Sequence, residues 1–70
     1  MIRKKDIKIG NLVEKGSDDC LDLFPGLYII IAREIEEGTD LNIISLYSIA
    51  EGKYYWIFES SLYFDFRIPD

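Results

Sequence analysis

The residues with the most chemical potential in this chain surround its one cysteine. Cys20 lies among Asp18, Asp19 and Asp22, in the segment between Gly16 and Gly26. A nucleophilic cysteine needs positively charged surroundings that favour its thiolate, and three neighbouring carboxylates do the opposite. The sequence contains no histidine, so it lacks the usual general base at neutral pH and the usual partner of a serine or cysteine nucleophile. We therefore predict that the chain is not an enzyme.

The same three aspartates are also the kind of hard oxygen ligand that calcium prefers. Their spacing does not match the D-x-[DN]-x-[DN]-G pattern of a calcium loop, so we interpret them as a solvated acidic loop rather than a metal site. One cysteine without histidine cannot assemble a four-ligand zinc site, and the five glycines are isolated turn residues rather than a phosphate-binding loop. We predict no metal, no cofactor and no small-molecule substrate.

Charge is distributed unevenly along the sequence. The net charge is −5; residues 1–15 carry five basic and two acidic residues, a balance of +3, and residues 16–70 carry three basic and eleven acidic residues, a balance of −8. An acidic body repels phosphate, so nucleic-acid binding is disfavoured. The basic segment Arg3–Lys8 is interpreted as a solubilising tail, with weak nucleic-acid binding as the alternative.

The chain carries no signal for a membrane or for secretion. Its longest apolar run, Leu27–Ala32, is too short to cross a bilayer, and no apolar segment follows the basic N-terminus. With a single cysteine it forms no internal disulfide, so we expect a soluble, cytoplasmic protein held together by hydrophobic packing, alone or with self-association.

Aromatic residues concentrate near the C-terminus, where Lys53–Arg67 holds seven of the ten. This stretch predicts two strands, Lys53–Phe58 and Leu62–Arg67, separated by a 3₁₀ turn at Glu59–Ser61. We expect the core to take Trp56, Phe58, Phe64 and Phe66. Alternation then places Tyr55 opposite Trp56, and Tyr63 opposite Phe64 and Phe66, as exposed side chains suited to protein binding or exposed incidentally.

The rest of the chain also predicts short strands. Leu12-Val13 opens a first strand, a long irregular loop covers 16–26, and strands follow at Leu27–Glu36 and Leu41–Ile49 with turns after each. The prediction is a single all-β domain over residues 1–70, with residues 1–6 as a flexible start. Closing the five strands into a small barrel would remove exposed edges.

Two segments resemble the Src-homology-3-like (SH3-like) small barrels. Ile9–Val13 resembles the "xGDxV" opening strand of bacterial and viral members, and Tyr55–Leu62 resembles their closing segment with tryptophan and leucine. The combination is similar to small proteins of tailed bacteriophages. The resemblance implies a five-stranded SH3-like barrel that is phage-encoded and located in a host cell or a virion. The ALYDY motif and paired tryptophan of the peptide-binding members are absent, so it does not extend to proline-rich peptide binding.

We therefore expect a non-enzymatic interaction or structural module that contacts a partner protein or its own copies. The candidate protein-binding residues are Asp18, Asp19, Asp22, Tyr55, Trp56 and Tyr63. The alternative is an acidic regulator or inhibitor that occupies a basic nucleic-acid-binding site on a host protein. That alternative requires the aspartates to share one side of the fold with Glu34, Glu36 and Glu37.

Overall fold

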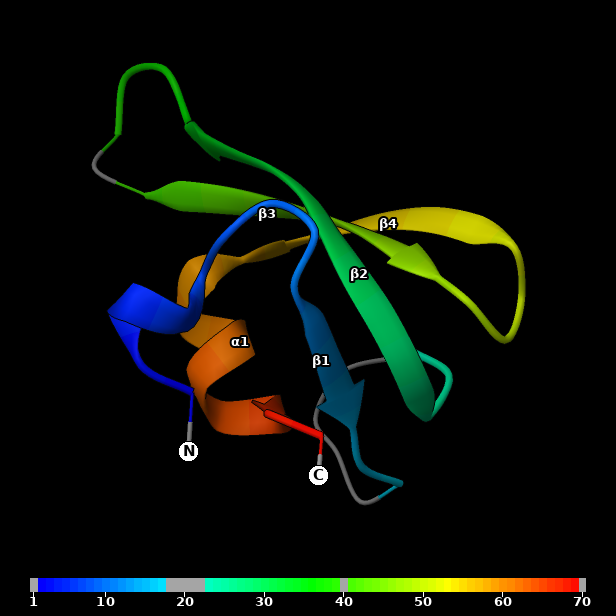
Figure 1. The fold of residues 1–70 in the computed structure, drawn as a ribbon. Helices are drawn as coiled ribbons and strands as arrows, with labels where there is room; N and C mark the ends of the chain where they lie inside the picture. Colours follow the sequence, from blue (N-terminus) through cyan, green and yellow to red (C-terminus); the bar gives the residue numbers. More distant parts are fainter. Residues whose placement is uncertain (1, 18–22, 40, 70) are drawn as a thin grey trace.

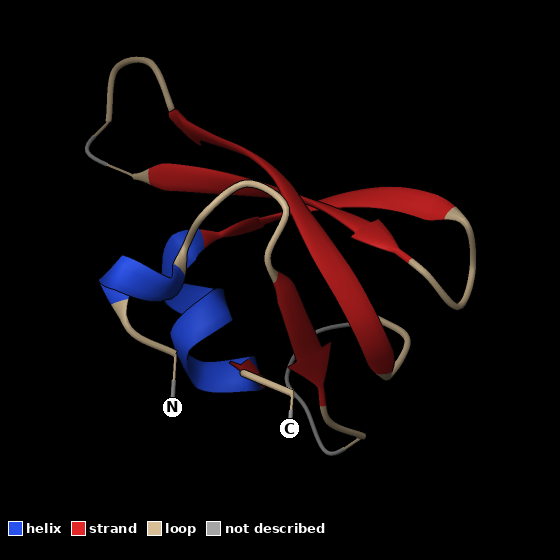
Figure 2. Ribbon diagram, viewed as in Figure 1, coloured by secondary structure: helices blue, strands red, loops and turns tan. Residues whose placement is uncertain are grey.

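The computed structural model describes residues 2–17, 23–39 and 41–69. Within them five antiparallel strands form one sheet in the order β4-β3-β2-β1-β5 (Figures 1 and 2). The strands are β1 (Leu12–Lys15), β2 (Gly26–Ile35), β3 (Asn42–Ser48), β4 (Lys53–Phe58) and β5 (Phe66–Arg67). A 3₁₀ turn, η1 (Lys4–Asp6), precedes the sheet, and a helix, α1 (Glu59–Asp65), joins β4 to β5. The prediction of a small, mostly β fold is confirmed.

The sheet is open, which corrects the prediction of a closed barrel. Across the described residues β4 pairs only with β3, and β5 pairs only with β1. The two edge strands, β4 and β5, do not pair with each other. Helix α1 separates them in the sequence, and β5 is only two residues long. None of the described helices is long and apolar enough to span a bilayer.

The largest error of the sequence prediction lies between Glu59 and Arg67. The expected 3₁₀ turn and strand Leu62–Arg67 are replaced by helix α1 and the short strand β5. The reason is that this segment satisfies two periodicities. Leu62, Phe64 and Phe66 alternate as in a strand, but Leu62, Tyr63 and Phe66 lie three, four and seven residues after Glu59, as one helical face does. The helix buries Leu62 and leaves Phe64 87% exposed, so the expected core position of Phe64 is wrong.

One face of the sheet, which we call the inner face, carries the hydrophobic core. Tyr28 and Ile30 of β2, Ile44 and Leu46 of β3, and Val13 of β1 are fully buried there. Helix α1 and η1 lie on this side of the sheet, as do the segments that lead to the two ends of the chain (Figure 2). The core is completed by Ile2, Ile7, Ile57, Leu62 and Phe66. The segment expected to be a flexible start therefore contributes to the core.

A β-bulge in β2 changes which side chains face inward along that strand. Ile30 pairs with Leu46, but the next pair joins Ala32 to Ser45, so Ile31 is the extra residue. Before the bulge the even-numbered side chains of β2 face the core, and after it the odd-numbered ones do, beginning with Arg33 opposite Ile44. The bulge thus directs Arg33 to the inner side, where it meets α1.

Candidate protein-binding interface

The face of the sheet opposite α1 is apolar, and none of the segments that the structure describes covers it. We call it the outer face, and it is formed by side chains that alternate with the buried ones along β1 to β4. The apolar members are Leu12, Leu27, Ile29, Ile31, Ala32, Ile43, Tyr47, Tyr54, Trp56 and Phe58. Because soluble proteins normally place polar residues on the solvent side of an antiparallel sheet, a face of this composition requires an explanation.

Aromatic rings dominate the edge of the outer face at β3 and β4. Tyr47 is the cross-strand partner of Tyr54, and their ring centroids lie 5.0 Å apart. Trp56 contacts Phe58 edge-to-face at 5.5 Å. Tyr54 is 71% exposed and Trp56 61%. If each of these side chains has on the order of 200 Å² of surface, the two together present roughly 250 Å² to solvent.

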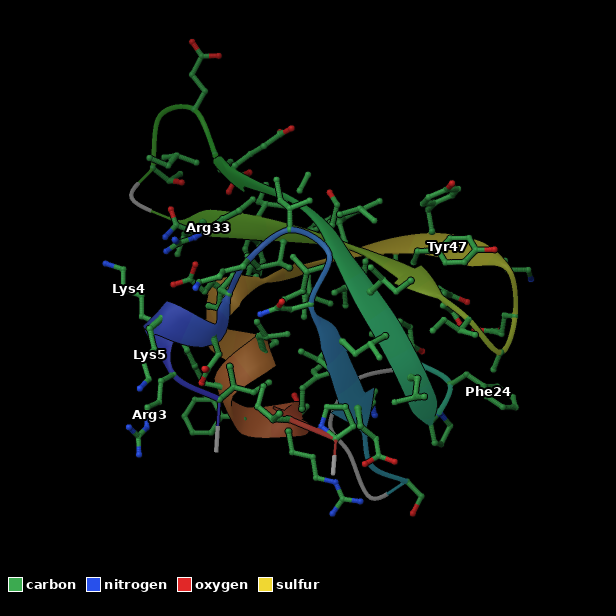
Figure 3. The ribbon with its side chains drawn as sticks, in the orientation of Figure 1. Arg3, Lys4, Lys5, Phe24, Arg33 and Tyr47 are labelled. Atoms are coloured by element: carbon green, nitrogen blue, oxygen red, sulfur yellow. The ribbon has the colours of Figure 1, made fainter. Side chains whose placement is uncertain are left out.

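Charged groups lie at the margins of the outer face rather than at its centre. Glu14 and Arg67 form an ion pair of 2.8 Å where β1 meets β5, and Glu34 lies near the far end of β2. The basic segment Arg3–Lys5 projects from the other side of the molecule from Tyr47 and the β3–β4 hairpin (Figure 3). The centre of the outer face is therefore neutral.

The three aromatic residues predicted as a binding surface do not share one surface. Trp56 lies on the outer face. Tyr55 is on the opposite side of β4, where it packs edge-to-face on Tyr28 at 6.2 Å and its hydroxyl donates to Glu51 Oε1 at 2.7 Å. Tyr63 lies on α1 and packs partly against the core. The assignment of Tyr55 as exposed and Trp56 as core is thus reversed.

The predicted acidic part of the site, Asp18, Asp19 and Asp22, lies outside the described residues, as does Cys20. Their proposed role in binding stays a prediction. Among the side chains that the structure describes, no three acidic or cysteine residues gather in a way that would hold a metal ion.

A polar cluster on the inner side is built around Glu59, the first residue of α1. Its Oε1 accepts from Arg33 Nε at 2.7 Å and from Asn42 Nδ2 at 3.3 Å, and its Oε2 accepts from the Tyr63 hydroxyl at 2.9 Å. Burial alone would raise the pKa of Glu59. The hydrogen bonds from Tyr63, Arg33 and Asn42, with the charge of Arg33, outweigh it and hold this pKa below 4.5.

The same contacts act on Tyr63 in the opposite direction. Burial, the hydrogen bond to Glu59 and the negative charge of Glu59 raise the pKa of the Tyr63 phenol above 10.0. Since the carboxylate stays ionised and the phenol stays neutral, the cluster is suited to fastening α1 to β2 and β3, and not to transferring protons near neutral pH.

One hollow of about 730 Å³ lies beside the end of β1 and the last residues of α1. Its lining mixes charged and apolar side chains, among them Glu14, Lys15, Phe64 and Phe66. It borders Ser17, after which residues 18–22 are outside the description. Phe64 is the most exposed of the large apolar residues described.

Sequence reasoning missed most of the outer face, including Tyr47, Tyr54 and Ile31. Two signals point to it. The run Leu27–Ala32 is apolar at every position, so this strand has no polar side to offer to water. The stretch Lys53–Phe58 is likewise apolar or aromatic at every position after Lys53, so it too has no polar side.

Comparison of the chain with protein-family models, with curated proteins and with solved structures finds no match.

Proposed function

We propose that this chain is a non-enzymatic protein-interaction module that binds through its outer face. The observation that carries the proposal is the exposure of Tyr54 and Trp56 within a continuous apolar surface. Large apolar patches on soluble monomers reach about 300–600 Å² and commonly mark binding sites. Two residues supply a large part of that range, and the other apolar members of the outer face extend it.

The composition of the outer face supports binding to protein rather than to nucleic acid. Protein interfaces are enriched in tyrosine, tryptophan and phenylalanine and poor in charge at their centres. A nucleic-acid surface needs lysine and arginine for phosphate, and Arg67, which is paired with Glu14, is the one basic residue on the outer face among the described strands.

We also propose a relationship of this fold to a known class of small barrels. Five antiparallel strands with a helical turn before the last one, and β5 beside β1, support assigning the chain to the SH3-like small barrels as an open variant. A phage origin rests on the resemblance of Ile9–Val13 and Tyr55–Leu62, and the genes that surround this one would test it. The alternative role as an acidic regulator stays a prediction, since three of its six carboxylates lie outside the described residues.

The proposed function is tested by photo-crosslinking in cells that express the chain. A benzophenone amino acid replaces Tyr54 in one variant and Ser60 in a control variant, because Ser60 is exposed on α1, away from the outer face. We expect protein adducts at position 54 and none at position 60. Equal yields, or no adduct at position 54, would contradict binding through the outer face.

A further inference from the structure

We propose that the occupant of the outer face is a second copy of this chain, packed sheet against sheet about a two-fold axis. This inference rests on the proposed function and specifies its partner. In such a dimer the same surface of both copies forms the interface. Two stacked sheets about 10 Å apart, with their strands within about 30° of each other, are a standard way to bury the second side of a sheet.

The size of the outer face fits a dimer. Leu12, Leu27 and Ile31 are each at least 36% exposed. Together with Tyr54, Trp56 and the half-buried side chains between them, they present roughly 600 Å², against about 800 Å² per partner in a standard protein interface. Burying the polar margin as well would make up the difference.

The charge distribution permits two copies to meet. Each chain carries a net charge of −5, so acidic surfaces of two copies repel each other. The outer face limits this repulsion because its centre is neutral. Of the two carboxylates at its margin, Glu14 is paired with Arg67, and Glu34 lies near the far end of β2. A neutral apolar surface needs no charge complement, so it is as well suited to its own copy as to any other partner.

The order of side chains across the strands also gives the outer face a row of small side chains into which a large one from a second copy can pack. Trp56 lies in one cross-strand row with Ser45 and Ala32, the smallest side chains of the outer face. On one side of that row Ile29, Tyr47 and Tyr54 form a row of large side chains. A two-fold arrangement allows Trp56 of each copy to pack over Ser45 and Ala32 of the other. This contact would bury the indole that a single copy leaves exposed.

The test uses the purified full chain, whose single tryptophan reports directly on the interface. Sedimentation is followed from about 1 µM to about 1 mM, a range that covers weak to moderate dissociation constants. We expect the mass to rise from 8.2 kDa to twice that value. The Trp56 emission should shift to shorter wavelength over the same range, because the indole leaves water.

Ser45→Lys should abolish this association, with Ser60→Lys as the control of equal charge. Ser45 lies in the interior of the outer face and Ser60 is exposed on α1. A lysine at position 45 would bury an unpaired ammonium in the interface, so we expect the dissociation constant to rise about 100-fold or more. The far-ultraviolet circular dichroism should be unchanged in both variants.

Each result decides the proposal. A dimer that survives Ser45→Lys would show that the copies pair through a surface other than the outer face, and a mass of 8.2 kDa at every concentration would show no self-association; both overturn the proposal. If the chain is monomeric but position 54 still crosslinks to a different protein in cells, this inference fails and the proposed function stands. If position 54 crosslinks to nothing, both fail.

Discussion

The two faces of this sheet are similar in composition but differ in what covers them. On the inner face, where α1 and η1 lie, Tyr28, Ile30 and Leu46 are fully buried, and on the outer face Tyr54 and Trp56 are mostly exposed. Hydrophobic residues on one strand therefore serve two purposes, and burial distinguishes them where residue type does not. The inner face stabilises the fold, and the outer face is available for association.

Adjacent isoleucines on opposite faces give the strongest test of this comparison. Ile30 is fully buried, and Ile31 is 36% exposed. Ile30→Ala should lower the free energy of unfolding by about 2–5 kcal/mol, because it removes buried methyl groups and leaves a cavity. Ile31→Ala should cost less than about 1 kcal/mol. Urea denaturation at a protein concentration too low for self-association measures both, and similar losses would show that the two faces contribute equally to the monomer.

The Glu59 cluster tests how firmly α1 is held on the inner face. Glu59→Gln removes the ion pair with Arg33 and weakens the hydrogen bond from Tyr63. We expect a loss of about 1–3 kcal/mol, since glutamine offers one uncharged acceptor oxygen where the half-buried carboxylate accepts from Arg33, Asn42 and Tyr63. Urea denaturation at neutral pH measures this loss.

This cluster also predicts a pH dependence with a definite sign. The folded-state pKa of Glu59 lies below the ordinary 4.5, so its contribution is fully present above pH 4.5 and is lost as the pH falls through the folded-state pKa. The thermal midpoint of the native chain should therefore fall more steeply than that of Glu59→Gln as the pH drops below 4.5. Parallel curves for the two proteins would rule out this role of the carboxylate.

Two tyrosine hydroxyls, one on each face, test the same comparison through smaller expected changes in the free energy of unfolding. The Tyr63 hydroxyl donates to Glu59 on the inner side, and Tyr54 is 71% exposed on the outer face. Tyr63→Phe should cost about 1 kcal/mol, the typical net value of one hydrogen bond. Tyr54→Phe should leave the stability of the monomer unchanged. Thermal unfolding of both variants provides the measurement, and equal costs would contradict the assignment of the hydroxyls.

The smallest effect is expected at the margin of the outer face. Arg67 and Glu14 form an ion pair whose side chains are exposed to solvent by 71% and 32%. Arg67→Ala should change the free energy of unfolding by no more than about 0.5 kcal/mol, because exposed pairs are weakened by water and salt. A loss as large as that of Ile30→Ala would mean that β5 is held mainly by this pair.

The presence of the strands could be predicted from the sequence, but which face of each strand is buried could not. Lys53–Phe58 was predicted with the observed bounds, and Leu27–Glu36 within one residue of β2, because long apolar runs between turn residues leave few alternatives. Alternation does not say which side of a strand is buried. For β4 that choice depends on Tyr28, a distant residue on which Tyr55 packs.

Each of the other errors also has a specific structural cause. Helix α1 was missed because the segment after Phe58 fits two periodicities at once, and its outcome depends on Arg33 and Asn42, which bind Glu59 from other strands. The bulge in β2 could not be predicted, because one extra residue is invisible in a pattern of uniformly apolar residues.

That bulge has a consequence for how the length of the chain can vary. Ile31 is one residue in excess of the ladder between β2 and β3, and removing it would leave Ile30 inward, Ala32 outward and Arg33 inward, as a regular strand requires. Deleting one residue from the middle of β3, which has no such excess, would turn half of that strand over. The gene can therefore lose a codon at position 31 far more safely than at position 44 or 45.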